Sequence, residues 1–183
     1  MQEFDSYFAT RRYQDLALRP DGDEVAFVAQ RGGRQAVVVR STRSTTGGGE
    51  STPTQGMQQL VELFPAWSSD GEVIRFWSCP GFRFPEFPEQ EQCPWREVAR
   101  LGGSIRSIDL PRNARFSAWS PDGARVAFIA SPDSIFTYSM RDGTTTLLAV
   151  PEAPTGLHSP VWSPDGRWIA YGNGNPRWLM AFN

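Results

Sequence analysis

The chain has 183 residues and a formal net charge of −2, and 39% of its residues are hydrophobic and 21% are charged. This composition excludes a disordered chain and a basic nucleic-acid-binding surface. No apolar run reaches the roughly 18 residues of a membrane-spanning helix, and residues 1–20 lack the apolar segment of a signal peptide. All 18 basic residues are arginine, so chemistry that needs a lysine is excluded.

Four similar segments recur along the chain. Each has a turn centred on Asp-Gly, followed by a run of β-branched, aromatic and small apolar residues. The turn aspartates are 49, 52 and 43 residues apart, and a period of roughly 40–50 residues with strand-like content is typical of propeller blades. The turn residues are Pro20, Asp21 and Gly22; Asp70 and Gly71; Pro121, Asp122 and Gly123; and Pro164, Asp165 and Gly166.

The chemistry of the repeated turn predicts its shape. In Ser-Pro-Asp-Gly, proline holds φ at about −65° in the second position, and aspartate suits the third. Glycine accepts the positive φ that closes the turn. We therefore expect each repeat to form a tight β-hairpin with a glycine bulge between its first two strands.

Each repeat is predicted to be an antiparallel meander of four strands, a to d. In the first blade, strand c is expected at 35–40 and strand d at about 58–63, with a flexible loop at 41–56 between them. The fourth blade has strands a and b and a c-like run, and it ends before strand d. After a lead-in of residues 1–13, the blades are placed at 14–63, 64–110, 111–150 and 151–183.

The fold class that follows is all-β, a β-propeller of four-stranded antiparallel blades that is incomplete. Runs such as Val37–Val39 are apolar on both sides, which fits sheets that stack face to face. The alternative, a β-sandwich, has no reason to repeat one turn sequence at this period. With about three and three-quarter blades, we expect an open arc whose exposed end blades cause self-association.

The string Trp162–Tyr171, Trp-Ser-Pro-Asp-Gly-Arg-Trp-Ile-Ala-Tyr, resembles the repeat of TolB-like, or WD-like, bacterial β-propellers. The third repeat, Trp119–Ala130, resembles it equally well. The second has Ser69 in place of proline, and the first departs from the pattern at Leu18 and Arg19. The resemblance implies a propeller, commonly six-bladed in this family, and no single function.

Two shorter stretches resemble particular propeller proteins. The start of the chain, Tyr7–Tyr13 running into the first repeat, is similar to the entry of the N-terminal propeller in prolyl-oligopeptidase-family serine peptidases. The stretch Ser159–Asn175 resembles propellers that form the sensor half of bacterial signalling proteins, including some serine/threonine kinases. The two resemblances imply different partner domains, a hydrolase or a kinase.

One face of the predicted propeller gathers aromatic and cationic residues. The b–c insertion of the second blade, residues 79–94, and the links that precede the third and fourth blades share this face. Exposed aromatic rings and arginines predict a docking surface for a peptide carboxylate or an acidic protein. The alternative is that the rings fold back over the blade and the charges are only solvated. The candidates are Phe82, Phe84, Phe87, Arg112, Arg115, Phe116 and His158.

The two cysteines, Cys79 and Cys93, flank this insertion at the bases of adjacent strands. A hairpin base can bring such residues within disulfide range, and a disulfide needs an oxidising compartment such as the periplasm. Because residues 1–20 show no signal peptide, two free thiols in the cytoplasm are favoured, and the disulfide in the periplasm is the alternative. A zinc site is not expected, because two cysteines with no nearby histidine fall short of four ligands.

Catalytic signatures are absent from the sequence. It contains no Gly-x-Ser-x-Gly, no P-loop and no His-Glu-x-x-His, and a serine triad would have to use His158, the single histidine. We expect the carboxylates at the edge of the first turn, Asp21, Asp23 and Glu24, to be solvated. Weak calcium binding by these carboxylates is the alternative. We therefore expect no catalysis by this chain and no cofactor or metal.

The predicted function is a binding or sensor scaffold for a protein or peptide, joined to the remaining blades or a fused domain of its parent. The alternative is the substrate-gating propeller of a prolyl-oligopeptidase-family serine peptidase. A propeller enzyme that processes sugars would need several channel histidines, and the chain has one.

Overall fold

The computed structural model describes residues 14–31, 34–43, 49–54, 60–80, 93–111, 114–130, 134–150, 157–173 and 179–182. Within these ranges every regular element is a β-strand, and the strands form four antiparallel sheets. The chain divides into two compact units, Met1–Asp109 and Leu110–Asn183. The prediction of an all-β protein built from propeller blades is confirmed. The predicted open arc describes how the two units are placed relative to each other, and it stays a prediction.

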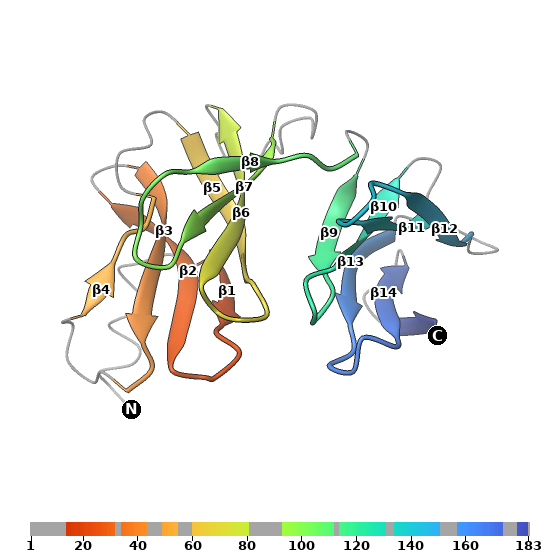
Figure 1. Ribbon diagram of the computed structural model, residues 1–183, viewed down its shortest axis with the longest axis horizontal. Coiled ribbons are helices and arrows are strands. Elements are labelled where there is room, and N and C mark those ends of the chain that lie inside the picture. The colour runs from red at the N-terminus through yellow and green to blue at the C-terminus, as the bar shows by residue number, and fades with distance from the viewer. Residues whose placement is uncertain are drawn as a thin grey trace. The chain divides into compact units, whose positions relative to one another are not determined.

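The first unit contains two four-stranded blades (Figure 1). Each is a simple meander, because the order of the strands in the sheet follows their order in the chain. The first blade consists of β1 (Gln14–Leu18), β2 (Glu24–Arg31), β3 (Arg34–Ser41) and β4 (Glu50–Ser51). The second consists of β5 (Leu60–Trp67), β6 (Val73–Pro80), β7 (Trp95–Ala99) and β8 (Arg106–Ile108).

The second unit contains a four-stranded and a three-stranded blade. The third blade consists of β9 (Arg115–Trp119), β10 (Arg125–Ala130), β11 (Ser134–Ser139) and β12 (Thr145–Ala149). The fourth consists of β13 (Leu157–Trp162), β14 (Ile169–Asn173) and β15 (Leu179–Phe182), so it has strands a to c as the sequence predicts.

One strand lies elsewhere than predicted. Strand d of the first blade was expected at about 58–63, within the blade assigned to 14–63, but the fourth strand is β4, inside the expected flexible loop. Residues 60–63 instead begin β5, which continues through Pro65 to Trp67. Proline lacks the N–H of a sheet ladder and suggests a break, but a bulge in β5 accommodates Pro65 without ending the strand.

Neighbouring blades within each unit share an apolar core. In the first unit, small side chains of β2 and β3 pack against Trp67, Ile74 and Phe76 of the second blade. In the second unit, Ile129 and Ile135 pack against Leu157 and Tyr171 of the fourth blade. Since every one of these residues is buried, the contact between sheet faces contributes to the apolar burial that stabilises each unit.

A tryptophan at the end of a first strand links the two blades of each unit. The indole Nε1 of Trp67 donates to the carbonyl oxygen of Ala17 at 2.9 Å, and that of Trp162 donates to Ala118 at 3.0 Å. The two bonds are equivalent in the repeat, because each acceptor directly precedes the tryptophan position of the earlier blade. The repeated tryptophan therefore satisfies its polar atom across the interface while its ring fills the core.

The Asp-Gly turns are held by a repeated hydrogen-bond network. The hydroxyls of Ser68 and Ser120 donate to Asp70 and Asp122 at 2.6 Å, and Ser163 donates to Asp165 in the same way. Each serine hydroxyl also accepts the backbone N–H two residues after the turn glycine, at 2.9 Å. The turn glycines Gly22, Gly71, Gly123 and Gly166 have φ between 67° and 78°, as the sequence predicts.

Replacing Trp162 with phenylalanine tests the bond between blades. Trp162→Phe leaves the partly buried carbonyl of Ala118 without its donor, so we expect the free energy of unfolding in urea to fall by about 1–3 kcal/mol. Trp168→Phe makes the same chemical change at a half-exposed ring and should cost less than about 0.5 kcal/mol. Equal losses in the two variants would contradict a specific role for the bond.

The turn network also predicts a pH dependence of stability. The Ser120 hydroxyl, followed by the backbone N–H of Ala124, lowers the pKa of Asp122 from its ordinary value. Because the folded pKa is the lower one, the contribution of this carboxylate is complete above its unfolded pKa, about 3.9, and is lost as the pH falls through the folded pKa.

We therefore expect Asp122→Asn to lower Tm by a few degrees at pH 7, with a smaller difference from the unsubstituted chain well below pH 3. Asp109→Asn, at an exposed aspartate outside the turns, should leave Tm unchanged at both pH values. A Tm difference for Asp122→Asn that is the same at both pH values would contradict this explanation.

Candidate functional site

The first strand of every blade contains a β-bulge at the same place in the repeat. In β5, β9 and β13 the register of pairing shifts between Leu63 and Ala66, Arg115 and Ala118, and His158 and Val161, so two residues oppose one. β1 has a related shift between Gln14 and Leu16. Bulges bend a strand and redirect its side chains, and they occur often beside functional sites.

Two of these bulges place a phenylalanine in the left-handed region of backbone space. Phe64 has φ of 53° and Phe116 has φ of 46°. Such a conformation costs about 1–3 kcal/mol for a residue other than glycine, and it persists only where the surrounding structure imposes it. Phe64 and Phe116 hold equivalent positions, each three residues before a tryptophan, so the same local geometry recurs in the second and third blades.

The two phenylalanine rings have different surroundings. The Phe64 ring packs edge-on against Trp77, with ring centroids 5.3 Å apart, and Trp77 contacts Trp95 in turn at 5.8 Å. The Phe116 side chain is 43% exposed. The same backbone geometry thus holds one ring inside an aromatic cluster and presents the other to solvent.

Arg115 and His158, both predicted from the sequence, occupy the same repeat position. Each lies four residues before its tryptophan, on β9 and on β13, and these two strands lie against each other. The structure describes their backbone, in which Arg115 pairs with Ile129 and His158 pairs with Gly172. Both residues and Phe116 were expected in links between blades, and the structure corrects this by placing them inside first strands.

For His158, the correction has the same cause as the misplaced strand of the first blade. Pro160 in β13 holds the position of Pro65 in β5, inside the bulge, where the missing N–H costs no ladder bond. The strand therefore extends past the proline toward the end of the blade opposite the Asp-Gly turn, and it carries His158 with it.

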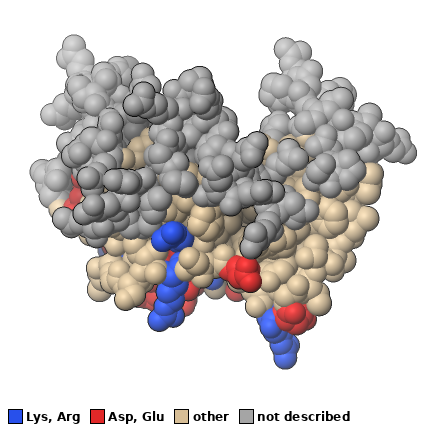
Figure 2. Space-filling model, turned by 90° about the horizontal axis from the view of Figure 1, so that it is seen from above, with Lys and Arg blue, Asp and Glu red and all other residues tan. Residues whose placement is uncertain are grey.

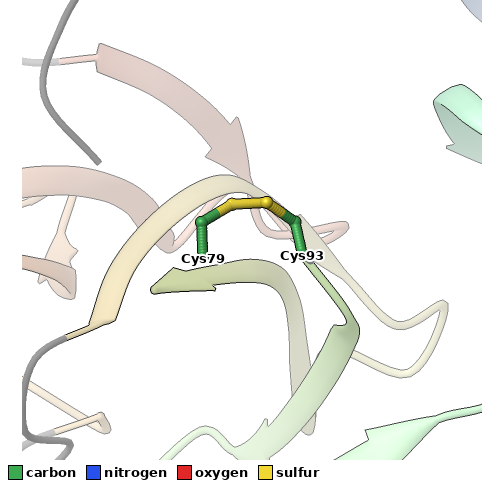
Figure 3. Close-up of a disulfide and its surroundings, with 2 residues drawn as sticks. All are labelled: Cys79 and Cys93. Atoms are coloured by element: carbon green, nitrogen blue, oxygen red, sulfur yellow. A yellow bond between two sulfur atoms is a disulfide. The ribbon is translucent and has the colours of Figure 1, made fainter. Parts of the chain in front are cut away.

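A disulfide joins Cys79 and Cys93 at the base of the β6–β7 connection (Figure 3). Cys79 lies in β6 and Cys93 shortly precedes β7, their Cα atoms are 4.3 Å apart, and both residues are buried. The sequence left this pairing open and favoured two free thiols, so the disulfide corrects that expectation. Phe82, Phe84, Phe87 and Arg112, also predicted for the docking face, lie outside the described residues.

The carboxylates considered for calcium binding are paired with arginines. Asp21 binds Arg19 at 2.7 Å, Asp23 binds Arg43 at 2.6 Å, and Glu24 binds Arg100 of the second blade at 3.0 Å. In the described ranges no group of three side chains is arranged to hold a metal ion, and no helix is long and apolar enough to span a membrane. Figure 2 shows charged side chains of both signs on a described surface that is mostly uncharged.

Comparison with known proteins identifies the fold. No protein-family model matches the chain. An uncharacterized peptidase of Bacillus subtilis (strain 168), YuxL, is 30% identical over 79 residues, which are 41% of this chain and 12% of that protein. The chain thus matches only a small part of this curated relative.

Solved structures cover nearly the whole chain. TolB from Acinetobacter baumannii matches with a TM-score of 0.68 and 16% identity, over 93% of this chain and 40% of that chain. A puromycin-hydrolyzing peptidase of Mycobacterium tuberculosis matches with a TM-score of 0.64 and 21% identity, over 96% of this chain and 29% of that one. The chain therefore has the fold of TolB and peptidase propellers and spans less than half of either structure.

Removing the disulfide tests its contribution to stability. The double substitution of Cys79 and Cys93 by serine opens a loop with a sequence separation of 14 residues, so we expect a loss of about 3 kcal/mol in the free energy of unfolding. The unsubstituted chain treated with dithiothreitol should lose a similar amount, and the reduced double variant should lose nothing further. A double variant as stable as the oxidised chain would contradict the prediction.

Proposed function

We propose that this chain is part of a β-propeller domain that binds an acidic peptide or protein at the bulged ends of β9 and β13. The observation that carries the proposal is Phe116, a half-exposed ring held at positive φ in a bulge of the first strand. Arg115 directly precedes this ring in β9, and His158 occupies the same repeat position as Arg115 on the adjoining β13.

The chemistry of these residues suits an anionic partner. Aromatic residues and arginine are enriched in the cores of protein interfaces, and the guanidinium group binds carboxylates through two parallel hydrogen bonds. A histidine ring N–H can also donate a hydrogen bond to a carboxylate. Strained backbone tends to mark a functional position, and unlike the packed ring of Phe64, the strained Phe116 presents its ring to solvent.

A second candidate function is the substrate-gating propeller of a prolyl-oligopeptidase-family serine peptidase. The similarity to the Bacillus subtilis and Mycobacterium tuberculosis peptidases favours it. The coding sequence of the parent gene separates the two proposals. A hydrolase region with Gly-x-Ser-x-Gly followed by aspartate and histidine supports gating, and a sensor kinase or DNA-binding region supports the scaffold.

We also propose that the chain works in an oxidising compartment such as the periplasm. The buried disulfide supports this location, because reducing compartments keep most structural cysteines as thiols.

Peptide selection tests the binding proposal. Short random peptides displayed on phage are selected on the immobilised chain, and enriched sequences are titrated by fluorescence anisotropy. We expect enriched peptides to carry acidic side chains, and we expect Phe116→Gly and Arg115→Ala each to weaken binding by about tenfold. Glycine adopts the positive φ of Phe116 freely, so Phe116→Gly removes the ring without disturbing the bulge.

The matched control is Leu147→Ala, which removes a 53% exposed apolar side chain from β12, the outer strand of the same blade. Its affinity should equal that of the unsubstituted chain. Selection without enrichment, or enriched peptides whose affinity ignores both Phe116→Gly and Arg115→Ala, would overturn the proposal.

A further inference from the structure

One half-buried arginine of the first unit differs from the others. The structure describes five such arginines in this unit, and four of them lie within 4.0 Å of a carboxylate oxygen. The ion pairs join Arg19 to Asp21 and Glu72, Arg40 to Glu50, Arg75 to Glu97, and Arg100 to Glu24. The fifth is Arg96 on β7, whose side chain forms no ion pair and no hydrogen bond in the part of the chain that the structure describes.

The surroundings of Arg96 make an unpaired charge costly. Its Nε atom is buried and has no hydrogen-bond partner among the described residues. Val98, two residues along β7, belongs to the apolar core that the first and second blades share. Because alternate residues of a strand face the same side, Arg96 lies on the face toward the first blade, next to this core. A charge in such a place lowers stability unless an anion compensates it.

Ser78 supplies a second unpaired donor on the same face of the second blade. The residue is 1% exposed, and its Oγ has no hydrogen-bond partner within the described ranges. It follows Phe76 by two residues on β6, and Phe76 pairs directly with Arg96. Ser78 and Arg96 are therefore diagonal neighbours in the sheet, with Cβ atoms roughly 7–8 Å apart, a separation that a long side chain can bridge.

Ser107 lies on the other side of Arg96 and opens the group to solvent. It pairs directly with Arg96 from the outer strand β8, so the two side chains share one face of the sheet, and Ser107 is exposed. The arginine thus stands between a buried and an exposed hydroxyl. We call Arg96, Ser78 and Ser107 the three-donor cluster, because each side chain can donate a hydrogen bond to an anion.

We propose that the three-donor cluster binds a singly charged carboxylate group of a ligand. A guanidinium group donates two parallel hydrogen bonds to a carboxylate, and the hydroxyls donate to the lone pairs that remain. The ligand supplies to Arg96 what Glu97 and Glu24 supply to the other arginines of the second blade, Arg75 and Arg100. The inference is independent of the proposed peptide-binding function, which concerns β9 and β13.

The charge of the cluster favours a carboxylate over a phosphate group. Arg96 contributes one positive charge, which one carboxylate balances, whereas a phosphate group carries about −1.5 to −2 at pH 7. Arg100 is the next arginine on this face of β7, and it is already bound to Glu24 at 3.0 Å. A second negative charge on the ligand would therefore lack a partner here.

Titration with N-acetylglycine, followed by NMR of the arginine Nε–H groups at constant ionic strength and pH 7, tests the proposal. We expect a saturable shift of the signal that Arg96→Gln removes. N-acetylglycinamide, which has the same shape without the charge, should cause no such shift. Ser78→Ala should weaken binding by about tenfold, because it removes a hydrogen bond to a charged group.

Acetate and inorganic phosphate complete the titrations. Acetate that binds as tightly as N-acetylglycine supports a free acid as the ligand, and weaker binding of acetate supports the C-terminus of a peptide. Phosphate that binds more tightly than N-acetylglycine would overturn the choice of a carboxylate.

Thermal unfolding separates a ligand site from a structural arginine. Without ligand, Arg96→Gln should keep or raise Tm because it removes an unpaired charge, whereas Arg100→Gln should lower Tm because it strands Glu24. Saturating N-acetylglycine should raise Tm of the unsubstituted chain by a few degrees and leave Tm of Arg96→Gln unchanged.

The matched control is Arg106→Gln, which removes an exposed arginine of β8 and should bind N-acetylglycine like the unsubstituted chain. Three results would overturn the proposal. They are the absence of saturable binding, an equal response to N-acetylglycinamide, and a lower Tm of Arg96→Gln without ligand, which would reveal a partner for Arg96 within the chain.

Discussion

Much of this structure depends on the hydrogen bond between a tryptophan indole and a backbone carbonyl of the preceding blade. A four-stranded sheet buries little apolar surface on its own. Apolar contact between two sheet faces has no direction, so it does not by itself fix how the two sheets align. The bonds from Trp67 to Ala17 and from Trp162 to Ala118 set that register, because an indole nitrogen in a partly buried interface needs its acceptor. Burial supplies the stability, and the directed bond fixes the alignment of the sheets.

The arginines that accompany these bonds show how a repeat keeps an interface while its sequence changes. Arg19 stands in the serine position of the first turn, whereas Arg125 stands two places after the third turn. Both guanidinium groups nevertheless reach the carbonyl of the next blade's turn glycine and approach its tryptophan ring. A long side chain with several donors can reach one target from two starting points.

Most of the fold could be predicted from the sequence, because the turn residues act locally. Proline, aspartate and glycine determine the turn wherever they occur, so the hairpins of all four blades lie where the repeat predicts. The hairpin also brings Cys79 and Cys93 within disulfide range, but the sequence favoured free thiols because residues 1–20 show no signal peptide. The fourth strand of the first blade was misplaced because Pro65 resembles a strand end, and only the pairing of β5 with β6 shows that the strand continues.

The candidate site was harder to predict from the sequence. Arg115, Phe116 and His158 were selected by their chemistry but assigned to links between blades, whereas the structure places them inside β9 and β13. The positive φ of Phe116 has no sequence signal, since phenylalanine does not favour that region. The signal that was present is positional, because counting back from each tryptophan aligns Phe116 with Phe64 and His158 with Arg115.

The bulge allows one residue of a blade to vary in its chemistry while the shape of the blade stays the same. The position that precedes it holds a different residue in every blade, namely Gln14, Leu63, Arg115 and His158, while the strand pairing around it stays nearly the same. A substitution there changes charge, size or titration behaviour at a fixed point of the backbone. A family of such domains can therefore acquire new recognition properties one residue at a time, without redesigning the sheets that carry them.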